Sequence, residues 1–486
     1  MSLILHPIIG LEIHARLATQ TKIFCSCRSD FGAPPNTHVC PICLGLPGAL
    51  PVLNRQAVAM AIKLGLFTGC QIATTAIFER KNYFYPDLPK GYQISQYESP
   101  LGRHGAVEIE VGDKRKRIGI QRIHLEEDAG KSIHQEDWLP PDQTMIDLNR
   151  CGVALLEIVS EPQLRSPEEA VSYLKMLRQM LIYLGICDGN MEEGHLRCDA
   201  NISLAATGHA PALPKTEIKN LNSFRSVARA LHFEIARQRE AILAGKPIVA
   251  ATLLWDAQKN IAVPMRVKET SPDYRYFPEP DLVPLQIDAG WCEVLRQQLP
   301  ELPLARRDRL MREHALSPTI ANQLTEEKAV AEYFEAVLAQ CPQPQVVSKW
   351  IIQELLPRTP VQREIASTAP TPAAMAEFLN LVIENKLKRS VAKDIFNQML
   401  QSGGSANAIY QSLRQPPAID PEELDLLVRK IIDQNPMAVR EFLAGKSNLI
   451  HFFIGQVLAA TGGRADAQEV ERLLLANMPA TDFSRG

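Results

Sequence analysis

The pattern of apolar and polar residues changes near residue 292 of this chain. Before that point, short runs rich in β-branched residues are separated by Gly, Pro and Asn, which is typical of strands joined by turns. The clearest case is a pair of alternating runs on either side of Gly112-Asp113, which predicts a hairpin. Two longer segments follow the helical period instead. We predict that these helices begin at Ser166, which opens a capping box, and at about Ser223.

From about residue 293 onward, the apolar residues follow the helical period throughout. Pro and residues that favour helix N-termini separate the successive periodic segments. The segment 402–408, Ser-Gly-Gly-Ser-Ala-Asn-Ala, has the composition of a linker. Strands followed by helices, rather than alternating with them, indicate an α+β protein. We expect three domains, at 1–292, 293–405 and 406–486.

Composition and charge narrow the classes of function. The chain has 486 residues, 46% of them hydrophobic, and a net charge of −3 from 52 Lys and Arg against 55 Asp and Glu. Without a basic excess, any nucleic-acid site must be a local patch, and a zinc-ribbon DNA binder is disfavoured. The sequence has no run of 18 apolar residues that would predict a membrane span, and its first ten residues lack the features of a signal peptide. We expect a cytoplasmic protein.

Four of the ten cysteines lie within nineteen positions, at Cys25, Cys27, Cys40 and Cys43. Two close pairs of thiolates suit tetrahedral zinc, although the first pair is a tighter Cys-x-Cys than usual. Such a site would be structural, because all four ligand positions would be filled by protein. The alternative is a group of unrelated buried thiols, which the spacing makes less favoured.

Several acids lie in strand-like runs of the first 290 residues. Glu12 and His14 are two residues apart and would share a face of a strand. They could be metal ligands, but for this pair alone a polar surface strand is the favoured interpretation. Glu157 lies within the apolar run 153–159, where a carboxylate is rarely buried without a partner. Glu157 is therefore a better candidate ligand than an exposed acid.

Further acids lie in other strand-like runs. Because side chains alternate along a strand, one of the adjacent Glu126 and Glu127 should point inward and the other away. Asp199 and Asn201 are two residues apart and share a face of a strand, as do Glu217 and Lys219. Oxygen ligands of this kind suit Mg²⁺, which bridges phosphate oxygens. A salt-bridge network is the alternative, and the repetition of such pairs favours a metal-dependent phosphate site.

An aromatic and basic stretch covers residues 80–92, and residues 273–281 resemble it. The first contains Lys81, Tyr83 and Lys90. Tyrosine rings can stack on bases while lysines contact phosphates, so these three residues are candidates for ATP binding. A packed Tyr/Pro loop is an equally good interpretation of the pattern alone.

In the helical part, cationic residues recur at Lys386, Lys388, Arg389 and Lys393. They could form a stripe that contacts phosphates, but a solvated helix face is the favoured interpretation.

Taken together, these blocks resemble the B subunits of the aspartyl/glutamyl-tRNA(Asn/Gln) amidotransferases over essentially the whole chain. The residues that carry the resemblance are 9–14, 25–54, 80–97, 124–131, 155–162, 189–201, 217–225, 273–282 and 445–475.

The resemblance implies a two-step reaction. ATP phosphorylates the side-chain carboxylate of Glu on tRNA(Gln), or of Asp on tRNA(Asn), and ammonia then displaces the phosphate. The ammonia would come from glutamine hydrolysis in a partner A subunit, and a small C subunit would complete a heterotrimer. The fold implied is a cradle-shaped catalytic domain built on an antiparallel sheet, followed by a helical domain and a tail that touches the tRNA.

The resemblance also implies ligand sets. The Mg²⁺ ligands correspond to His14, Glu127 and Glu157, and a second cation position corresponds to Glu12 with Asp199 and Glu217. The zinc ligands correspond to all four clustered cysteines.

Some residues depart from the family pattern, namely Cys151, Ala154, His195 and the run 252–254, and none of them is a proposed ligand. A non-catalytic RNA-binding scaffold held by zinc remains the alternative function.

Overall fold

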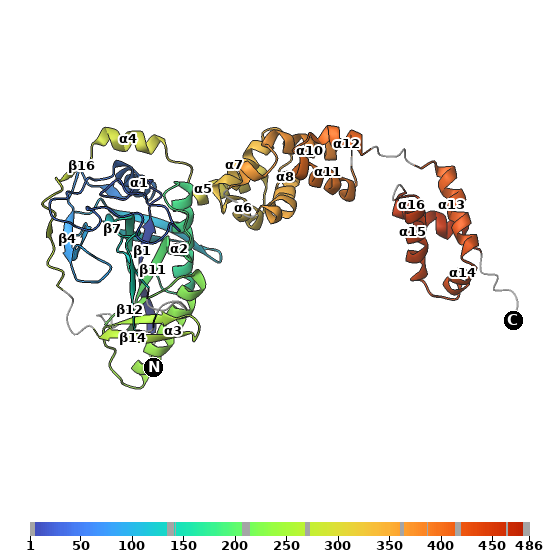
Figure 1. Ribbon diagram of the computed structural model, residues 1–486. Helices are drawn as coiled ribbons and strands as arrows, with labels where there is room; N and C mark the ends of the chain where they lie inside the picture. The colour runs from blue at the N-terminus through green and yellow to red at the C-terminus, as the bar shows by residue number, and fades with distance from the viewer. Residues whose placement is uncertain are drawn as a thin grey trace. The chain divides into compact units, whose positions relative to one another are not determined.

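The computed structural model describes residues 5–133, 140, 142–206, 214–267, 273–359, 364–385, 387–413, 419–462 and 465–479. The chain forms two compact units, one up to Glu332 and the other from Tyr333 on. Figure 1 shows the strands gathered in the first unit and helices alone in the second. The chain is therefore a mixed α+β protein with a helical C-terminal region, while the predicted boundaries at 292 and 405 stay predictions.

A nine-stranded sheet forms the centre of the first unit. All neighbouring strands are antiparallel except β12 and β13, which are parallel. In spatial order the strands are β14 (Ile261–Val267), β13 (Ala251–Asp256), β12 (Thr216–Lys219), β11 (Leu196–Ala206), β1 (Leu5–Arg16), β10 (Ala154–Ser160), β7 (Lys114–Glu127), β6 (Gly102–Val111) and β2 (Gln71–Ile72).

One face of this sheet is apolar and carries the core. Ile9, Leu11 and Ile13 of β1 are fully buried in a cluster that also contains Leu156 and Ile158 of β10. Side chains of α1 (Arg55–Phe67), α2 (Pro167–Tyr183) and α3 (Phe224–Leu243) belong to the same cluster. Because side chains alternate between faces along a strand, the polar residues between these apolar ones must point the other way.

The local predictions for this unit are largely confirmed. Strands β6 and β7 pair up to Val111 and Lys114, and Gly112 adopts the left-handed conformation that the tight turn requires. The Ser166 hydroxyl accepts from the N–H of Glu169 at the start of α2, and Ser223 caps α3 in the same way.

Smaller sheets and helices complete the first unit. The sheets are β15 (Phe277–Pro278) with β4 (Glu79–Asn82) and β5 (Tyr92–Ser95), then β16 (Leu285–Gln286) with β3 (Thr75–Ala76), and β8 (Lys131–Ile133) with β9 (Met145–Asp147). The further helices are α4 (Ala289–Gln297), α5 (Pro303–His314) and α6 (Pro318–Thr325).

The second unit is helical. Its elements are α7 (Lys328–Leu338, which begins in the first unit), α8 (Pro344–Trp350), the π-helix η1 (Ile351–Leu355), η2 (Leu356–Arg358), α9 (Ile365–Thr368), α10 (Pro372–Glu384), α11 (Arg389–Ser402), α12 (Ala406–Ser412), α13 (Pro421–Gln434), α14 (Pro436–Leu443), α15 (Leu449–Ala460) and α16 (Ala467–Asn477). None of the described helices in either unit is long and apolar enough to cross a bilayer.

The linker predicted at 402–408 is wrong in structural terms. Gly403 ends α11 with a positive φ, and Ser405 caps α12, which packs on α10 and α11. The small residues serve a helix C-terminus and the next N-cap, two functions that share the composition of a flexible linker.

The packing of the central strands gives a stability prediction. Ile13→Ala should lower the unfolding free energy of the first unit by about 2–4 kcal/mol, because it leaves a cavity in a fully buried site. Urea unfolding followed by circular dichroism measures this. Val52→Ala is the matched control, since Val52 is 71% exposed and its truncation should change stability by less than about 0.5 kcal/mol. Equal effects of the two substitutions would contradict the assignment of the core.

Candidate functional site

The polar face of the central strands brings together side chains from distant parts of the chain. His14 of β1 lies opposite Glu157 of β10, and Glu157 lies opposite His124 of β7. Glu12 and Glu126 follow the same alternation, each two residues from one of these histidines. Sheet register alone therefore creates a row of imidazoles and carboxylates across three strands.

Within this row the side chains are in contact. The Nε2 atom of His14 lies 3.3 Å from a carboxylate oxygen of Glu126 and 3.3 Å from one of Glu157. The Nε2 atom of His124 lies 3.2 Å from Glu157 and 3.8 Å from Glu126. Donor atoms of Glu12, His14 and Glu157 lie within 4.8 Å of one another. We call these five residues the carboxylate–imidazole cluster.

Burial and charge determine the protonation of this cluster. Burial alone would lower the pKa of each imidazole, but hydrogen bonds and charge from Glu126 and Glu157 raise the pKa of His14 well above its usual value. The same balance raises the pKa of His124 to about 9. Burial opposes ionisation of the carboxyls too, yet the histidines hold the pKa values of Glu126 and Glu157 below their usual range. Two imidazolium ions thus neutralise two buried carboxylates.

Glu127 does not join the cluster. Its carboxylate accepts hydrogen bonds from the ammonium of Lys90 and from the N–H of Ile94, the latter at 2.9 Å. Alternation explains the difference, because Glu126 is two residues from His124 and shares its face, whereas Glu127 does not. This spacing was visible in the sequence and pointed to Glu126, which the predicted ligand set omitted along with His124.

The predicted second cation position contains a lysine. The ammonium of Lys219 contacts the carboxylate of Asp199 at 2.5 Å and that of Glu217 at 2.9 Å. These two acids raise the pKa of Lys219 against the effect of burial. Asp199 also lies opposite Glu12 in the register of β1 and β11, so this lysine extends the polar row away from His14.

The two aromatic segments lie side by side, because β4 pairs with β15 in the structure. The ammonium of Lys81 lies 5.1 Å from the ring centre of Tyr274 and 5.9 Å from that of Tyr83. Glu126 and Glu157 raise the pKa of Lys81 against the effect of burial, so the charge of Lys81 interacts electrostatically with the carboxylate–imidazole cluster. The structure thus brings Lys81 and Tyr83 to the same site as the acids.

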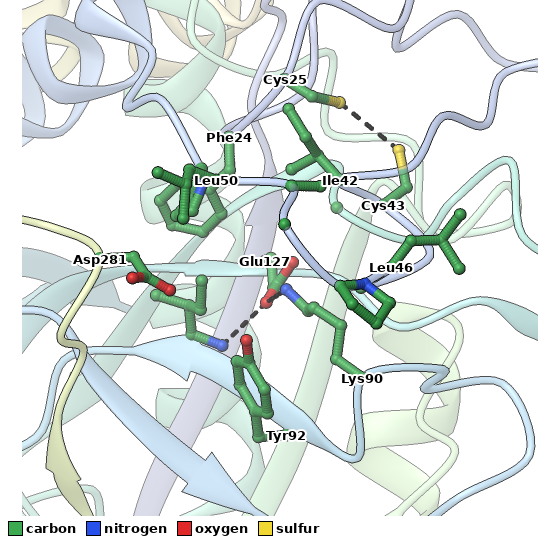
Figure 2. Close-up of a pocket in the computed structure, with 17 residues that line it drawn as sticks. Phe24, Cys25, Ile42, Cys43, Leu46, Leu50, Lys90, Tyr92, Glu127 and Asp281 are labelled. Carbon is green, nitrogen blue, oxygen red and sulfur yellow. Dashed lines mark hydrogen bonds and ion pairs between the residues drawn. The ribbon is translucent and has the colours of Figure 1, made fainter.

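Lys90 lies in a separate cavity of about 220 Å³. Figure 2 shows its ammonium pointing at Glu127, with Cys25 and Cys43 on the other side of the cavity. Residues 45–51, which follow the last two cysteines of the cluster, line the cavity between them. Gly45 has a positive φ, and a Cβ at this position would collide with the side chain of Lys90. The cysteine loop and Lys90 are therefore closely packed.

The four clustered cysteines converge. The sulfur of Cys43 lies 3.4 Å from that of Cys25, 3.6 Å from that of Cys40 and 3.8 Å from that of Cys27. Tetrahedral ligands about 2.3 Å from a metal ion are separated by about 3.8 Å, so this group can hold a metal. Contact with Cys25 lowers the pKa of Cys43 to about 4, and the buried ammonium of Lys22 adds to the effect.

Comparison with known proteins gives matches over nearly the whole chain. Residues 7–293 match a family described as the GatB/GatE catalytic domain, and residues 332–478 match one described as the GatB domain. Curated relatives that are named as the B subunit of an aspartyl/glutamyl-tRNA(Asn/Gln) amidotransferase include one from Nitratidesulfovibrio vulgaris (strain DP4), which is 46% identical over 97% of this chain and 98% of its own length. Another, from Chlorobium phaeobacteroides, is 47% identical over 96% of this chain and 98% of its own length.

The protonation of the cluster predicts a pH dependence. A histidine whose folded pKa is raised stabilises the fold below its usual pKa, and this contribution is lost as the pH rises through the raised value. Metal-free protein should therefore lose about 3 kcal/mol of stability between pH 6.5 and pH 9 through His124.

Urea unfolding at a series of pH values in the presence of a chelator measures this loss. In His124→Gln the dependence over this pH range should become shallower, while in His232→Gln, which changes an exposed histidine, it should not. A wild-type curve that is flat from pH 6.5 to 9 would contradict the assignment.

Proposed function

Because the chain belongs to the family of B subunits of the aspartyl/glutamyl-tRNA(Asn/Gln) amidotransferases, we propose that it is the ATP-dependent subunit of such a ligase. It phosphorylates the side-chain carboxylate of Glu-tRNA(Gln) or Asp-tRNA(Asn) and amidates it with ammonia, giving Gln-tRNA(Gln) or Asn-tRNA(Asn). The carboxylate–imidazole cluster beside Lys81 is the observation that carries this proposal.

The chemistry explains why such a cluster is needed. A carboxylate is a poor acyl donor, and phosphorylation supplies a leaving group for ammonia to displace. Phosphoryl transfer depends on positioning and on neutralising charge on the phosphate oxygens. Mg²⁺ supplies that neutralisation when it is bound. Lys81 contributes a further positive charge, and the rings of Tyr83 and Tyr274 beside it offer faces for a base.

His14, Glu126 and Glu157 are the residues we propose to hold Mg²⁺. They offer two carboxylates and one imidazole, and the Nε2 atom of His14 lies 3.3 Å from an oxygen of each carboxylate. Glu126 replaces Glu127 in the predicted set, because the carboxylate of Glu127 is engaged by Lys90. The second cation position, at Glu12, Asp199 and Glu217, would need Lys219 to move away.

The same family membership underlies the proposed partners. We expect a heterotrimer with an amidase A subunit that hydrolyses glutamine and with a small C subunit, and we expect the complex to act in the cytoplasm. The names of the relatives favour this enzyme over the alternative of a non-catalytic, zinc-stabilised scaffold.

Glu157→Gln should lower transfer of the ATP γ-phosphate to Glu-tRNA(Gln) by about a hundredfold or more, because it removes a ligand charge from the proposed magnesium site. The measurement uses radiolabelled ATP and the reconstituted complex, and tRNA affinity should be unchanged. Glu192→Gln makes the same change at an exposed turn and should retain full transfer. Normal transfer by Glu157→Gln would refute the metal assignment.

The cysteine site yields a separate prediction. We propose zinc as its metal, since four sulfurs at these distances suit its tetrahedral geometry. The wild-type chain should contain one equivalent of zinc, and Cys40→Ser should contain less. The melting temperature of the first unit should also fall, because metal binding stabilises the loop.

Emission spectrometry of the purified chain, with a parallel thermal scan, measures both quantities. Cys292→Ser is the matched control, since it changes a cysteine outside the cluster. Purified wild-type protein with no zinc, even after zinc is added, would refute this site.

A further inference from the structure

The second unit contains a cavity whose lining includes no residue of the carboxylate–imidazole cluster. It measures about 400 Å³, within the range of small-ligand sites, and lies between α8, η1, α10 and α11. Trp350, Val346 and Val382 form part of its apolar lining, and Lys349 and Arg389 form part of its polar lining. A cavity with an apolar wall and a basic rim suits a ligand with a flat ring and a negative charge.

Positive charges outnumber negative ones around Glu354, which also lines the cavity. One buried carboxylate, that of Glu354, contacts Arg358 at 3.2 Å, Arg389 at 3.1 Å and Lys393 at 2.9 Å. These cations hold the pKa of Glu354 below its usual value although burial opposes this. The single negative charge of Glu354 balances one of these three cations, so two positive charges in this group remain uncompensated. An anion at the rim would relieve their mutual repulsion.

Local structure holds this rim in place. In η1 the N–H of Leu356 bonds to the carbonyl of Ile351, the wide π-helical turn that is frequent at functional sites. Arg389 and Lys393 lie one turn apart on α11 and reach the same carboxylate. Their side chains are 61% and 40% exposed, so both remain accessible to a ligand.

The aromatic wall is also fixed. Trp350 is half-buried and makes edge contacts with Phe378 at 4.9 Å and with Phe396 at 5.6 Å between ring centres. A ring braced in this way can present a surface for stacking at little entropic cost, because its rotamer is already set by packing.

We propose that this cavity binds one nucleotide of the tRNA, with the base against Trp350 and its phosphate on Arg389 and Lys349. The inference rests on the proposed function for its ligand, and it adds a contact in the helical region before the tail. It also assigns Arg389, which the sequence pattern favoured as part of a solvated face, to a site. Lys393 of the same pattern contacts Glu354 beside it, and Lys386 lies outside the described residues.

The charge contacts are tested by tRNA binding to the full chain at several salt concentrations. In the double variant Lys349→Gln and Arg389→Gln, the slope of log affinity against log salt should become shallower by about 0.7–0.9 for each phosphate that the variant no longer neutralises. Affinity at moderate salt should fall several-fold. Arg312→Gln removes one positive charge from an exposed residue of α5, as each single substitution does at the cavity, and should leave slope and affinity unchanged.

The stacking contact has a different signature. Trp350→Leu should weaken binding about tenfold with no change in the salt slope. Because Trp350 also packs on phenylalanines, Val346→Phe serves as a second variant that fills the cavity without removing Trp350. Ultraviolet cross-linking of the wild-type chain to tRNA should give an adduct within residues 345–358.

The outcomes separate this inference from the proposed function. If the wild-type complex transfers phosphate and binds tRNA while the charge variants bind equally well, the nucleotide site is refuted and the enzyme stands. If the variants instead weaken assembly with the other subunits, the cavity is a protein-docking site, which also overturns the inference. If the wild-type complex shows no transfer and no tRNA binding, the proposed function itself fails.

Discussion

The structure depends on the need to compensate two carboxylates that are buried on a sheet. Glu126 and Glu157 are each no more than 5% exposed, and burying an isolated carboxylate costs far more than folding can supply. His14 and His124 meet this need from the neighbouring strands β1 and β7. Each of these carboxylates needs a positive partner. A metal ion can supply that positive charge in place of the proton on an imidazole.

The rest of the first unit keeps this arrangement in register. Since a one-residue slip would exchange the two faces of a strand, the apolar residues that α1, α2 and α3 cover also fix the position of each acid. The paired strands β4 and β15 then bring Lys81 and its tyrosines to the same side as Glu126 and Glu157. Core packing and site geometry are thus two consequences of one alternation.

Features set by neighbours in the chain could be predicted from the sequence, whereas features set by register between distant segments could not. The turn at Gly112 and the caps at Ser166 and Ser223 follow from local chemistry, and the structure has them. The spacing along β7 places Glu126 on the face of His124, but the contact of Glu126 with His14, more than a hundred residues away, depends on strand pairing. The ammonium of Lys219 between two predicted ligands is likewise visible only after β11 and β12 are paired.

We propose that the buried carboxylates of Glu126 and Glu157, together with His14, form the cation site of the first unit. The most direct test is an anomalous difference map from crystals of the full chain soaked in Mn²⁺. We expect a peak coordinated by His14, Glu126 and Glu157. A peak beside Glu127 with none at His14, or none anywhere near these three residues at saturating Mn²⁺, would contradict it.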